Sequence, residues 1–390
     1  MDQYFVNLEL VPTSCITKII AGGLLPKNGM IWEFTNEIKP VDLYCYLHAK
    51  YGKPNGVQTL LKNNDSDNLI HWDWTFANEH GLITVMGLNF RTEVHLMGDF
   101  KGRGLSLEMF IQQIKSDFVN HGKEISIFKK SLEKWTQFVN PHHRIRRAVD
   151  ESFRQLDALD LNPSADRVAS PKTIDESNEF RDRWLGLSAR YSAGIGLVFG
   201  LRAMLPVLAE SFINFLIFSL AKPEVKSNER LFNAAVRQAI DIRVQSLHLN
   251  CLGFQKPIDY TAAECKQFHT LMNDRNDLLH GNVEVSKLSI GDIYFQEKTP
   301  LFIEYDDVWS ISIGASMNSV RFATVHSDHE IVETFIEYII GHLESNVAAQ
   351  IRHLITIPYL GFNSATGRLG VLIPESIADF RTYHSAETKE

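Results

Sequence analysis

Apolar and polar residues alternate along the first hundred positions of the chain. Apolar side chains take every second position in five short segments, namely 4–10, 41–47, 70–76, 82–87 and 92–97. A period of two is typical of strands with one buried face, and Gly, Asn and Pro residues separate the segments. The pattern predicts a β-rich domain over residues 1–105, built as an antiparallel sheet or a small sandwich.

A helical period replaces this alternation after residue 105. Apolar positions then recur every three or four residues in three segments, which are 106–120, 125–139 and 145–159. Residues 162–171 are dominated by Pro, Ser and Asp and keep no apolar period, so we interpret them as a linker. We therefore expect residues 106–175 to form a helical connector.

Longer helices are predicted beyond the linker, over 174–191, 197–220, 228–250 and 261–280. Thr261 is placed to cap the last of them, and Gly281 lies just past its end. Two short strands and one more helix follow, at 293–295, 301–305 and 330–343. The predicted fold class is α+β, in which a helical domain over 176–345 carries a small strand-bearing insertion and 346–390 form an extension.

The most apolar stretch of the chain, residues 200–221, is long enough to be considered as a membrane span. Arg202 and Glu210 interrupt it. An ionisable side chain at bilayer depth is costly, so spans rarely carry one without a partner. We therefore interpret the stretch as the core helix of a soluble domain and expect no membrane association.

Composition limits the classes of protein to which this chain can belong. The chain has 390 residues and a formal net charge of −8, which argues against a surface coated for nucleic acid but permits a local basic site. Its four cysteines are scattered and form no C-x-x-C pair, which favours a reducing cytoplasm over a disulfide framework or a zinc site. The first ten residues are polar and alternating, unlike a signal peptide.

The chemistry of the chain is concentrated at the end of the helix predicted over 261–280. There the sequence from Arg275 reads RNDLLHG, which places His280 five positions after Arg275. Arginine offers a permanent charge and several donors to a phosphate, and imidazole moves protons near neutral pH. Asn276 and His280 share a helix face, whereas Arg275 projects about 140° from His280. The helix dipole and Asp277 both favour the imidazolium form of His280.

This pattern resembles the R-x4-6-H motif of HEPN domains, which are helical modules that often act as ribonucleases. An earlier apolar helix carries Glu210 and Asn214 on one side, similar to the polar face of an early HEPN helix. The resemblance covers residues 176–345 and is closest to the Apea-like HEPN group of bacterial defence proteins. In that group a β-rich domain commonly precedes the HEPN domain.

The resemblance implies a metal-independent endoribonuclease without a cofactor. Two motifs would meet across a homodimer to form one composite site. His280 would transfer protons, Arg275 would stabilise the charge on the pentacoordinate phosphate and Asn276 would orient the His or the phosphate. Glu210, Asn214 and Asp277 would support them. The products would carry a 2′,3′-cyclic phosphate and a 5′-OH, and the need for a 2′-OH would restrict the substrate to RNA. Some HEPN toxins carry a Tyr, modified with AMP, where this chain has Asn282.

Other sequence features have alternative interpretations. A basic cluster formed by His143, Arg144, Arg146 and Arg147 could contact an RNA backbone, although a solvated helix face is the simpler interpretation. The adjacent His142 and His143 are weak evidence for a metal, and we expect none. Aromatic side chains at 72, 74 and 76 share one side of a strand, where sheet core is favoured over base stacking.

Three hypotheses therefore remain open. The first is a cytoplasmic HEPN endoribonuclease, placed by analogy in antiphage defence or among toxins, whose N-terminal domain senses a phage or cellular trigger. The second is a non-catalytic HEPN-fold module that binds RNA, nucleotide or protein. The third is an unrelated helical interaction protein, in which Arg275 and His280 would point away from any pocket and any dimer interface.

Overall fold

The computed structural model describes residues 4–26, 28–62, 68–168, 171–283, 285–304 and 307–373. The chain forms two compact units, one of Met1–Thr136 with Gly361–Glu390 and one of Gln137–Leu360. The first unit contains an antiparallel sheet and the second is largely helical, so the predicted α+β class is confirmed. The helices expected as a connector over 106–175 are divided between the two units.

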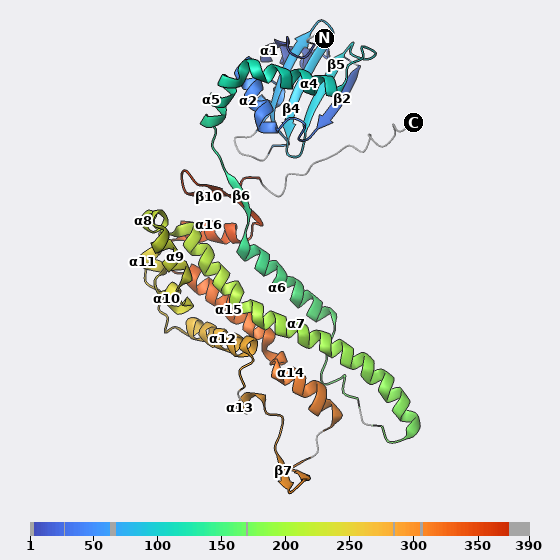
Figure 1. Ribbon diagram of the computed structural model, residues 1–390, viewed down its shortest axis with the longest axis vertical. Helices are drawn as coiled ribbons and strands as arrows, with labels where there is room; N and C mark the ends of the chain where they lie inside the picture. Colours follow the sequence, from blue (N-terminus) through green and yellow to red (C-terminus); the bar gives the residue numbers. More distant parts are fainter. Residues whose placement is uncertain are drawn as a thin grey trace. The chain divides into compact units, whose positions relative to one another are not determined.

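A five-stranded antiparallel sheet forms the centre of the first unit (Figure 1). Its strands lie in the order β1-β3-β4-β5-β2, with bounds β1 (Glu9–Leu10), β2 (Gly29–Phe34), β3 (Ile70–Asn78), β4 (Gly81–Leu88) and β5 (Thr92–Gly98). The alternation at 70–76, 82–87 and 92–97 thus predicted three strands correctly. In β3 the side chains of Trp74 and Phe76 are fully buried, which confirms the expectation of sheet core.

Helices cover both faces of this sheet. They are α1 (Thr13–Ala21), α2 (Pro40–Tyr51), α3 (Val57–Leu61), α4 (Leu107–Asp117), the short helix η1 (Phe118–His121) and α5 (Gly122–Ser131). Leu43 of α2 and Phe110 of α4 pack with Trp74 in the main core. Ile16 of α1 packs with Leu82 on the opposite face. Helices therefore shield both faces of the central strands from solvent.

Two predicted strands of the first unit are corrected by the structure. Segment 41–47 lies in the helix α2, because Pro40 occupies its first turn and Leu43, Tyr46 and Leu47 recur at helical spacing toward the core. Segment 4–10 is strand only at Glu9–Leu10. Its earlier part turns, so that Phe5 enters the core.

The chain passes from the first unit to the second through β6 (Thr136–Val139) and returns through β9 (Tyr359–Asn363). β9 pairs with β10 (Arg368–Gly370) as a hairpin. The helix predicted over 125–139 is wrong in its second half, because α5 ends at Ser131 and the backbone of Leu132 is extended. Residues 374–390 lie outside the described residues.

The second unit is a helical bundle around one very long helix (Figure 1). Its helices are α6 (Pro141–Ala158), α7 (Ile174–Leu220), α8 (Pro223–Ser227), α9 (Glu229–Arg237), α10 (Ile240–Gln245), α11 (Leu247–Asn250), α12 (Ala263–His280), α13 (Val285–Leu288), η2 (Ser310–Gly314), α14 (Ala315–Ser319), η3 (Phe322–Thr324), α15 (Val325–Ile340) and α16 (Ser345–Ile355). The strands β7 (Ile293–Gln296) and β8 (Thr299–Phe302) pair after α12, which confirms the predicted insertion.

α7 is continuous over 47 residues, whereas two helices were predicted. Gly194 and Gly196 lie within it without breaking it, and Gly194 lets Leu161 approach its backbone closely. By length and composition α7 could cross a membrane, but half of its apolar window is buried inside the protein. The core helix of a soluble protein also passes this test of length and composition. Pro206 also lies inside the helix and is buried.

The helix predicted over 228–250 is divided into α9, α10 and α11. The chain turns at Gln238 and Ala239, which have extended backbones. This turn buries Ile240 and Val244 and brings Arg243 of α10 against α7. Tertiary packing thus overrides the local helical period here.

Candidate functional site

α12 carries the Arg–His motif and ends where the sequence predicts. Gly281 adopts a left-handed conformation with φ +61°, which glycine accommodates without strain. The N–H groups of Gly281 and Asn282 both donate to the carbonyl of Asp277 and close the last turn. The predicted start differs by two residues. Thr261 does not cap the helix but donates its N–H and hydroxyl to Asp259.

The three proposed catalytic side chains lie in the last turns of α12. His280 is exposed, and Arg275 is half-buried. Arg275 Nη1 donates to Asn276 Oδ1 at 3.1 Å, while its Nε is buried without a hydrogen-bond partner among the described residues. Asn276 therefore helps to position the guanidinium of Arg275.

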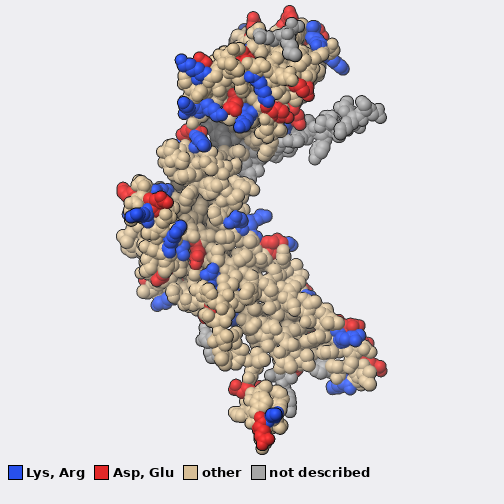
Figure 2. Space-filling model, viewed as in Figure 1, with Lys and Arg blue, Asp and Glu red and all other residues tan. Residues whose placement is uncertain are grey.

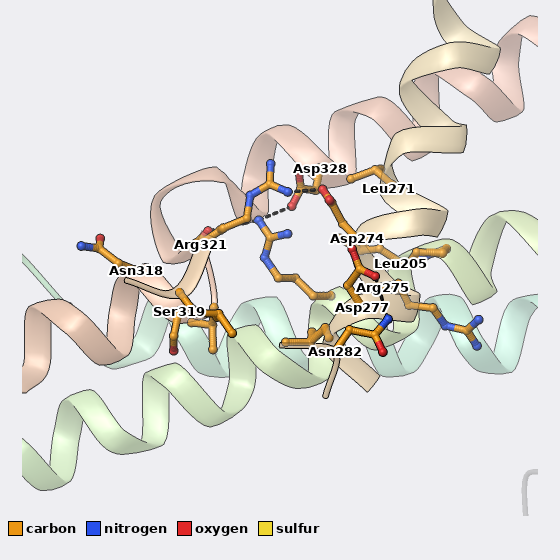
Figure 3. A pocket seen from close by; sticks show the side chains of 15 residues that line it. Leu205, Leu271, Asp274, Arg275, Asp277, Asn282, Asn318, Ser319, Arg321 and Asp328 are labelled. Carbon is orange, nitrogen blue, oxygen red and sulfur yellow. Dashed lines mark hydrogen bonds and ion pairs between the residues drawn. The ribbon is translucent and has the colours of Figure 1, made fainter. Parts of the chain in front are cut away.

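A cavity of about 350 Å³ lies on another flank of α12. Asp274, Arg275 and Asp277 contribute to its wall, but Asn276 and His280 do not. Figure 3 shows the side chain of Arg275 extending away from the cluster formed by Asp274, Arg321 and Asp328. The motif and the cavity thus share one helix but present their polar groups in different directions.

Two ion pairs line this cavity. Arg202 of α7 meets Asp328 of α15 at 2.7 Å, and both side chains are almost fully buried. Arg321, held in a left-handed backbone conformation with φ +50°, pairs with Asp274 of α12. Burial raises the pKa of Asp328 despite the neighbouring Arg202. Arg202 also donates to Thr324 Oγ1 at 2.6 Å, but its Nε has no partner among the described residues.

Asp277 supports the end of the helix as well as lining the cavity. Its Oδ1 accepts a hydrogen bond from Asn282 Nδ2 at 2.9 Å. Asn282 also lines the cavity. The two side chains form an acid–amide pair at the point where α12 stops.

The other expected supporting residues form a different cluster. Asn214 Oδ1 accepts from Arg243 Nη1 at 2.7 Å, and Glu210 lies 3.8 Å from Arg243 Nη2. Arg243 is buried, so this cluster ties α10 to α7. Neither Glu210 nor Asn214 lines the cavity beside Arg275.

The basic cluster of α6 is partly engaged inside its own unit. Arg146 forms two hydrogen bonds with Glu333 of α15, at 2.8 and 3.2 Å. Arg144 and Arg147 are exposed, and His143 is half-buried. Figure 2 shows Lys and Arg mixed with Asp and Glu on the face in view, rather than a continuous basic field.

His142, next to this cluster, is a core residue. Its Nδ1 lies 3.0 Å from Ser211 Oγ, and burial lowers its pKa to about 4. The imidazole is therefore neutral near pH 7, and its position between α6 and α7 is structural.

Sequence reasoning missed the residues that complete the cavity. Arg202 was noted only as an interruption of an apolar stretch, and Arg321 and Asp328 were not singled out. A charged residue inside an apolar helix needs a partner, so Arg202 was itself a signal of a buried acid elsewhere. The identity of that acid depends on the fold. Comparison of the chain with protein-family models, curated proteins and solved structures finds no match in any of the three.

Proposed function

We propose that this chain is a metal-independent endoribonuclease of the HEPN type. The observation that carries the proposal is the arrangement of the last turns of α12. His280 is exposed there, and Arg275 is half-buried and lines the neighbouring cavity. With two copies of the chain paired, these residues would offer a phosphodiester a permanent cation and a group that transfers protons.

The reaction follows from these two groups. The ribose 2′-oxygen forms a bond to the adjacent phosphorus while the bond from phosphorus to the 5′-oxygen breaks. The proton of the 2′-OH is removed and a proton is delivered to the 5′-oxygen, and His280 takes part in this transfer. Arg275 stabilises the charge on the pentacoordinate phosphate, and Asn276 positions Arg275. The products are a 2′,3′-cyclic phosphate and a 5′-OH.

A homodimer completes the site. Arg275 and His280 project about 140° apart around α12, so one copy does not direct both at one phosphate. A second copy of the chain contributes its own α12, so that Arg275 and His280 from the two copies can reach the same phosphate. By analogy with HEPN proteins we place the enzyme in the cytoplasm, in antiphage defence or as a toxin, with the first unit sensing a trigger.

Cleavage of RNA in EDTA tests the proposal. We expect the full-length protein to cleave, and His280→Ala and Arg275→Ala each to lose at least about 100-fold in rate, as is common when an acid–base or charge-stabilising group is removed. His269→Ala and Lys266→Ala alter exposed residues of the same helix and serve as matched controls. Cleavage that survives in both motif variants would exclude this site. Mass spectrometry of the ends checks the cyclic phosphate.

A non-catalytic RNA-binding module is the second candidate. It is favoured by the contacts of Glu210 and Asn214, which are bound to Arg243 rather than placed beside the motif. This candidate predicts that RNA binds in EDTA without being cleaved, under every trigger supplied, and that His280→Ala leaves the affinity unchanged.

A further inference from the structure

The hairpin of β7 and β8 is a small sheet with exposed apolar strands. Among the described residues it has two strands, and every residue of both strands is exposed. In β7 the side chains of Ile293, Tyr294 and Phe295 are 48, 66 and 64% exposed. A two-stranded hairpin without further packing is marginally stable in water. We therefore looked for the surface that this hairpin is built to meet.

The apolar surface of the hairpin is large enough for a protein partner. Leu301 and Ile303 are exposed beside the three apolar residues of β7. With roughly 200 Å² for a large side chain, these five residues expose on the order of 600 Å². Each partner in a standard protein complex contributes about 800 Å². A patch of this size on a soluble protein is typical of an interaction site.

The register of the hairpin shows which edge can accept another strand. Two residues connect the strands, because Gln296 lies opposite Thr299. In such a hairpin the pair next to the turn is hydrogen-bonded, and the following pairs alternate between bonded and non-bonded. The backbone N–H and C=O groups of Ile293 and Phe295 therefore point away from β8, to the outer edge of β7.

The outer edge of β8 is protected in the same geometry. Pro300 lies opposite Phe295, so its nitrogen also faces outward, where proline has no N–H to donate. Edge strands are commonly protected by proline or by charged side chains, and β7, with the sequence IYFQ, has neither. The hairpin thus has one protected edge and one open edge.

We propose that β7 pairs antiparallel with β7 of a second copy of this chain. The two hairpins then form one four-stranded sheet in the order β8-β7-β7-β8. Ile293 of each copy lies opposite Phe295 of the other, and these residues exchange their outward-facing backbone hydrogen bonds. Tyr294 lies at the two-fold axis opposite its own copy, in a non-bonded pair where aromatic side chains approach closely.

The strand itself favours a second copy as the occupant of this edge. A two-fold interface uses the same surface on both partners, so the surface must be complementary to itself. β7 meets this condition because it carries no charge that would be repelled by its own copy. The alternating donors and acceptors of Ile293 and Phe295 also match their own copies in antiparallel order.

The pairing deepens the proposed function, because it assigns a contact surface to the homodimer, and its link to catalysis rests on that function. β7 begins 13 positions after His280, at the end of the helix that carries the motif. The four-stranded sheet would therefore join the two chain segments that follow the two motifs.

Sedimentation velocity of the full-length protein without RNA tests the pairing. We expect the wild type to be dimeric. Tyr294→Lys places two positive charges opposite each other at the axis and should raise the dissociation constant at least about tenfold, and Tyr294→Glu should do the same with negative charges. An equal mixture of the two variants should dimerise within about threefold of wild type, because opposite charges then face each other.

Leu301 provides the matched control. It lies opposite Tyr294 on the same face of the hairpin and is also exposed. In the four-stranded sheet the two copies of Leu301 are three strand spacings apart, roughly 14 Å. Leu301→Lys and Leu301→Glu should therefore change the dissociation constant by less than about threefold, alone or mixed.

The outcomes separate this inference from the ribonuclease proposal. A dimer that Tyr294→Lys loses and the mixture restores supports the pairing, and if that dimer never cleaves RNA, the ribonuclease proposal alone fails. A monomeric wild type, a dimer that Tyr294→Lys leaves intact, or a mixture that stays monomeric overturns the pairing, even where the wild type cleaves RNA. An equal loss in Leu301→Lys overturns it as well, because the edge of β7 would then not be the contact.

Discussion

Each unit of this protein buries an aspartate beside a cation, and the two pairs differ in how fully they are satisfied. In the first unit Asp117 accepts from Lys50 at 2.5 Å, Tyr46 at 2.6 Å and Asn120 at 2.8 Å. In the second unit Asp328 faces Arg202 at 2.7 Å on the wall of a cavity. Both carboxylates are more than nine-tenths buried.

The difference between the two aspartates appears in the pKa values of their carboxyl groups. Burial alone would raise the pKa of Asp117, but hydrogen bonds from Lys50, Tyr46 and Asn120 lower it to about 2. Burial also raises the pKa of Asp328, and the positive charge of Arg202, which lowers this pKa, does not fully offset the rise. The ionised carboxylate of Asp117 therefore stabilises the first unit, whereas the ionised carboxylate of Asp328 destabilises the second. A buried acid with a raised pKa on the wall of a cavity is a candidate for contact with a ligand.

The largest expected effect comes from removing the pair in the second unit. The double substitution Arg202→Met with Asp328→Leu replaces two buried charges by apolar side chains of similar volume. Such replacements are often neutral or stabilising by about 1–4 kcal/mol. We therefore expect the free energy of unfolding of the second unit to stay the same or rise.

Fluorine NMR of fluorotryptophan-labelled protein in urea measures this effect for each unit. Trp74 is buried in the first unit and Trp309 in the second, so each ring reports its own unit. The signal of Trp74 is the internal control and should not change its midpoint. A loss of more than about 1 kcal/mol at Trp309 would show that the pair stabilises the fold.

Lowering the pH is expected to change the contributions of Asp117 and Asp328 to stability in opposite directions. The pKa of Asp117 is lowered from 3.8 to about 2, which corresponds to about 2 kcal/mol of stability. That stability is fully present above about pH 4 and is lost as the pH falls through 2. Asp117→Asn should therefore be about 2 kcal/mol less stable than wild type at pH 6 and approach it below pH 2.

Asp328 provides the matched comparison. Its raised pKa makes ionisation a cost that is fully present above the folded pKa and relieved as the pH falls toward 3.8. Wild type should therefore gain stability relative to Asp328→Asn as the pH falls toward 3.8, and lose stability relative to Asp117→Asn as the pH falls further toward 2. The fluorine signals of Trp309 and Trp74 follow these differences. Parallel losses against both variants would contradict the contrast.

The sequence predicted the parts of the molecule that local periodicity governs. The strands β3, β4 and β5 alternate because one residue in two faces the same core, and α12 ends at Gly281 because glycine accepts the left-handed backbone. Segment 41–47 alternates equally well but forms the helix α2. A short apolar run fits both periods, and here packing against the sheet decides between them.

The sequence alone predicts the motif, because its residues lie close together along the chain. It does not predict the cavity. Arg275 and His280 are five positions apart on one helix. Arg202 and Asp328 are 126 positions apart, and Arg321 and Asp274 are 47 apart. Such pairs exist only after α7, α12 and α15 have packed. The apolar stretch around Arg202 predicted that it is buried, and no local pattern identified its partner.

The smallest effect concerns Asp277, whose backbone carbonyl holds the end of α12 while its side chain lines the cavity. Gly281 donates to that carbonyl from a left-handed conformation, and a Cβ at Gly281 would meet nothing within 4 Å. Gly281→Ala should therefore cost only the backbone strain, about 1 kcal/mol in the second unit, and Gly281→Asn less, because Asn tolerates this conformation.

Gly196 is the matched control for this strain. It is exposed within α7, and a Cβ there also meets nothing within 4 Å, but its backbone is helical. Gly196→Ala should stabilise the second unit by about 0.5–1 kcal/mol, opposite in sign to Gly281→Ala. If both substitutions shifted the midpoint of Trp309 in the same direction, the left-handed cap would not be what positions Asp277.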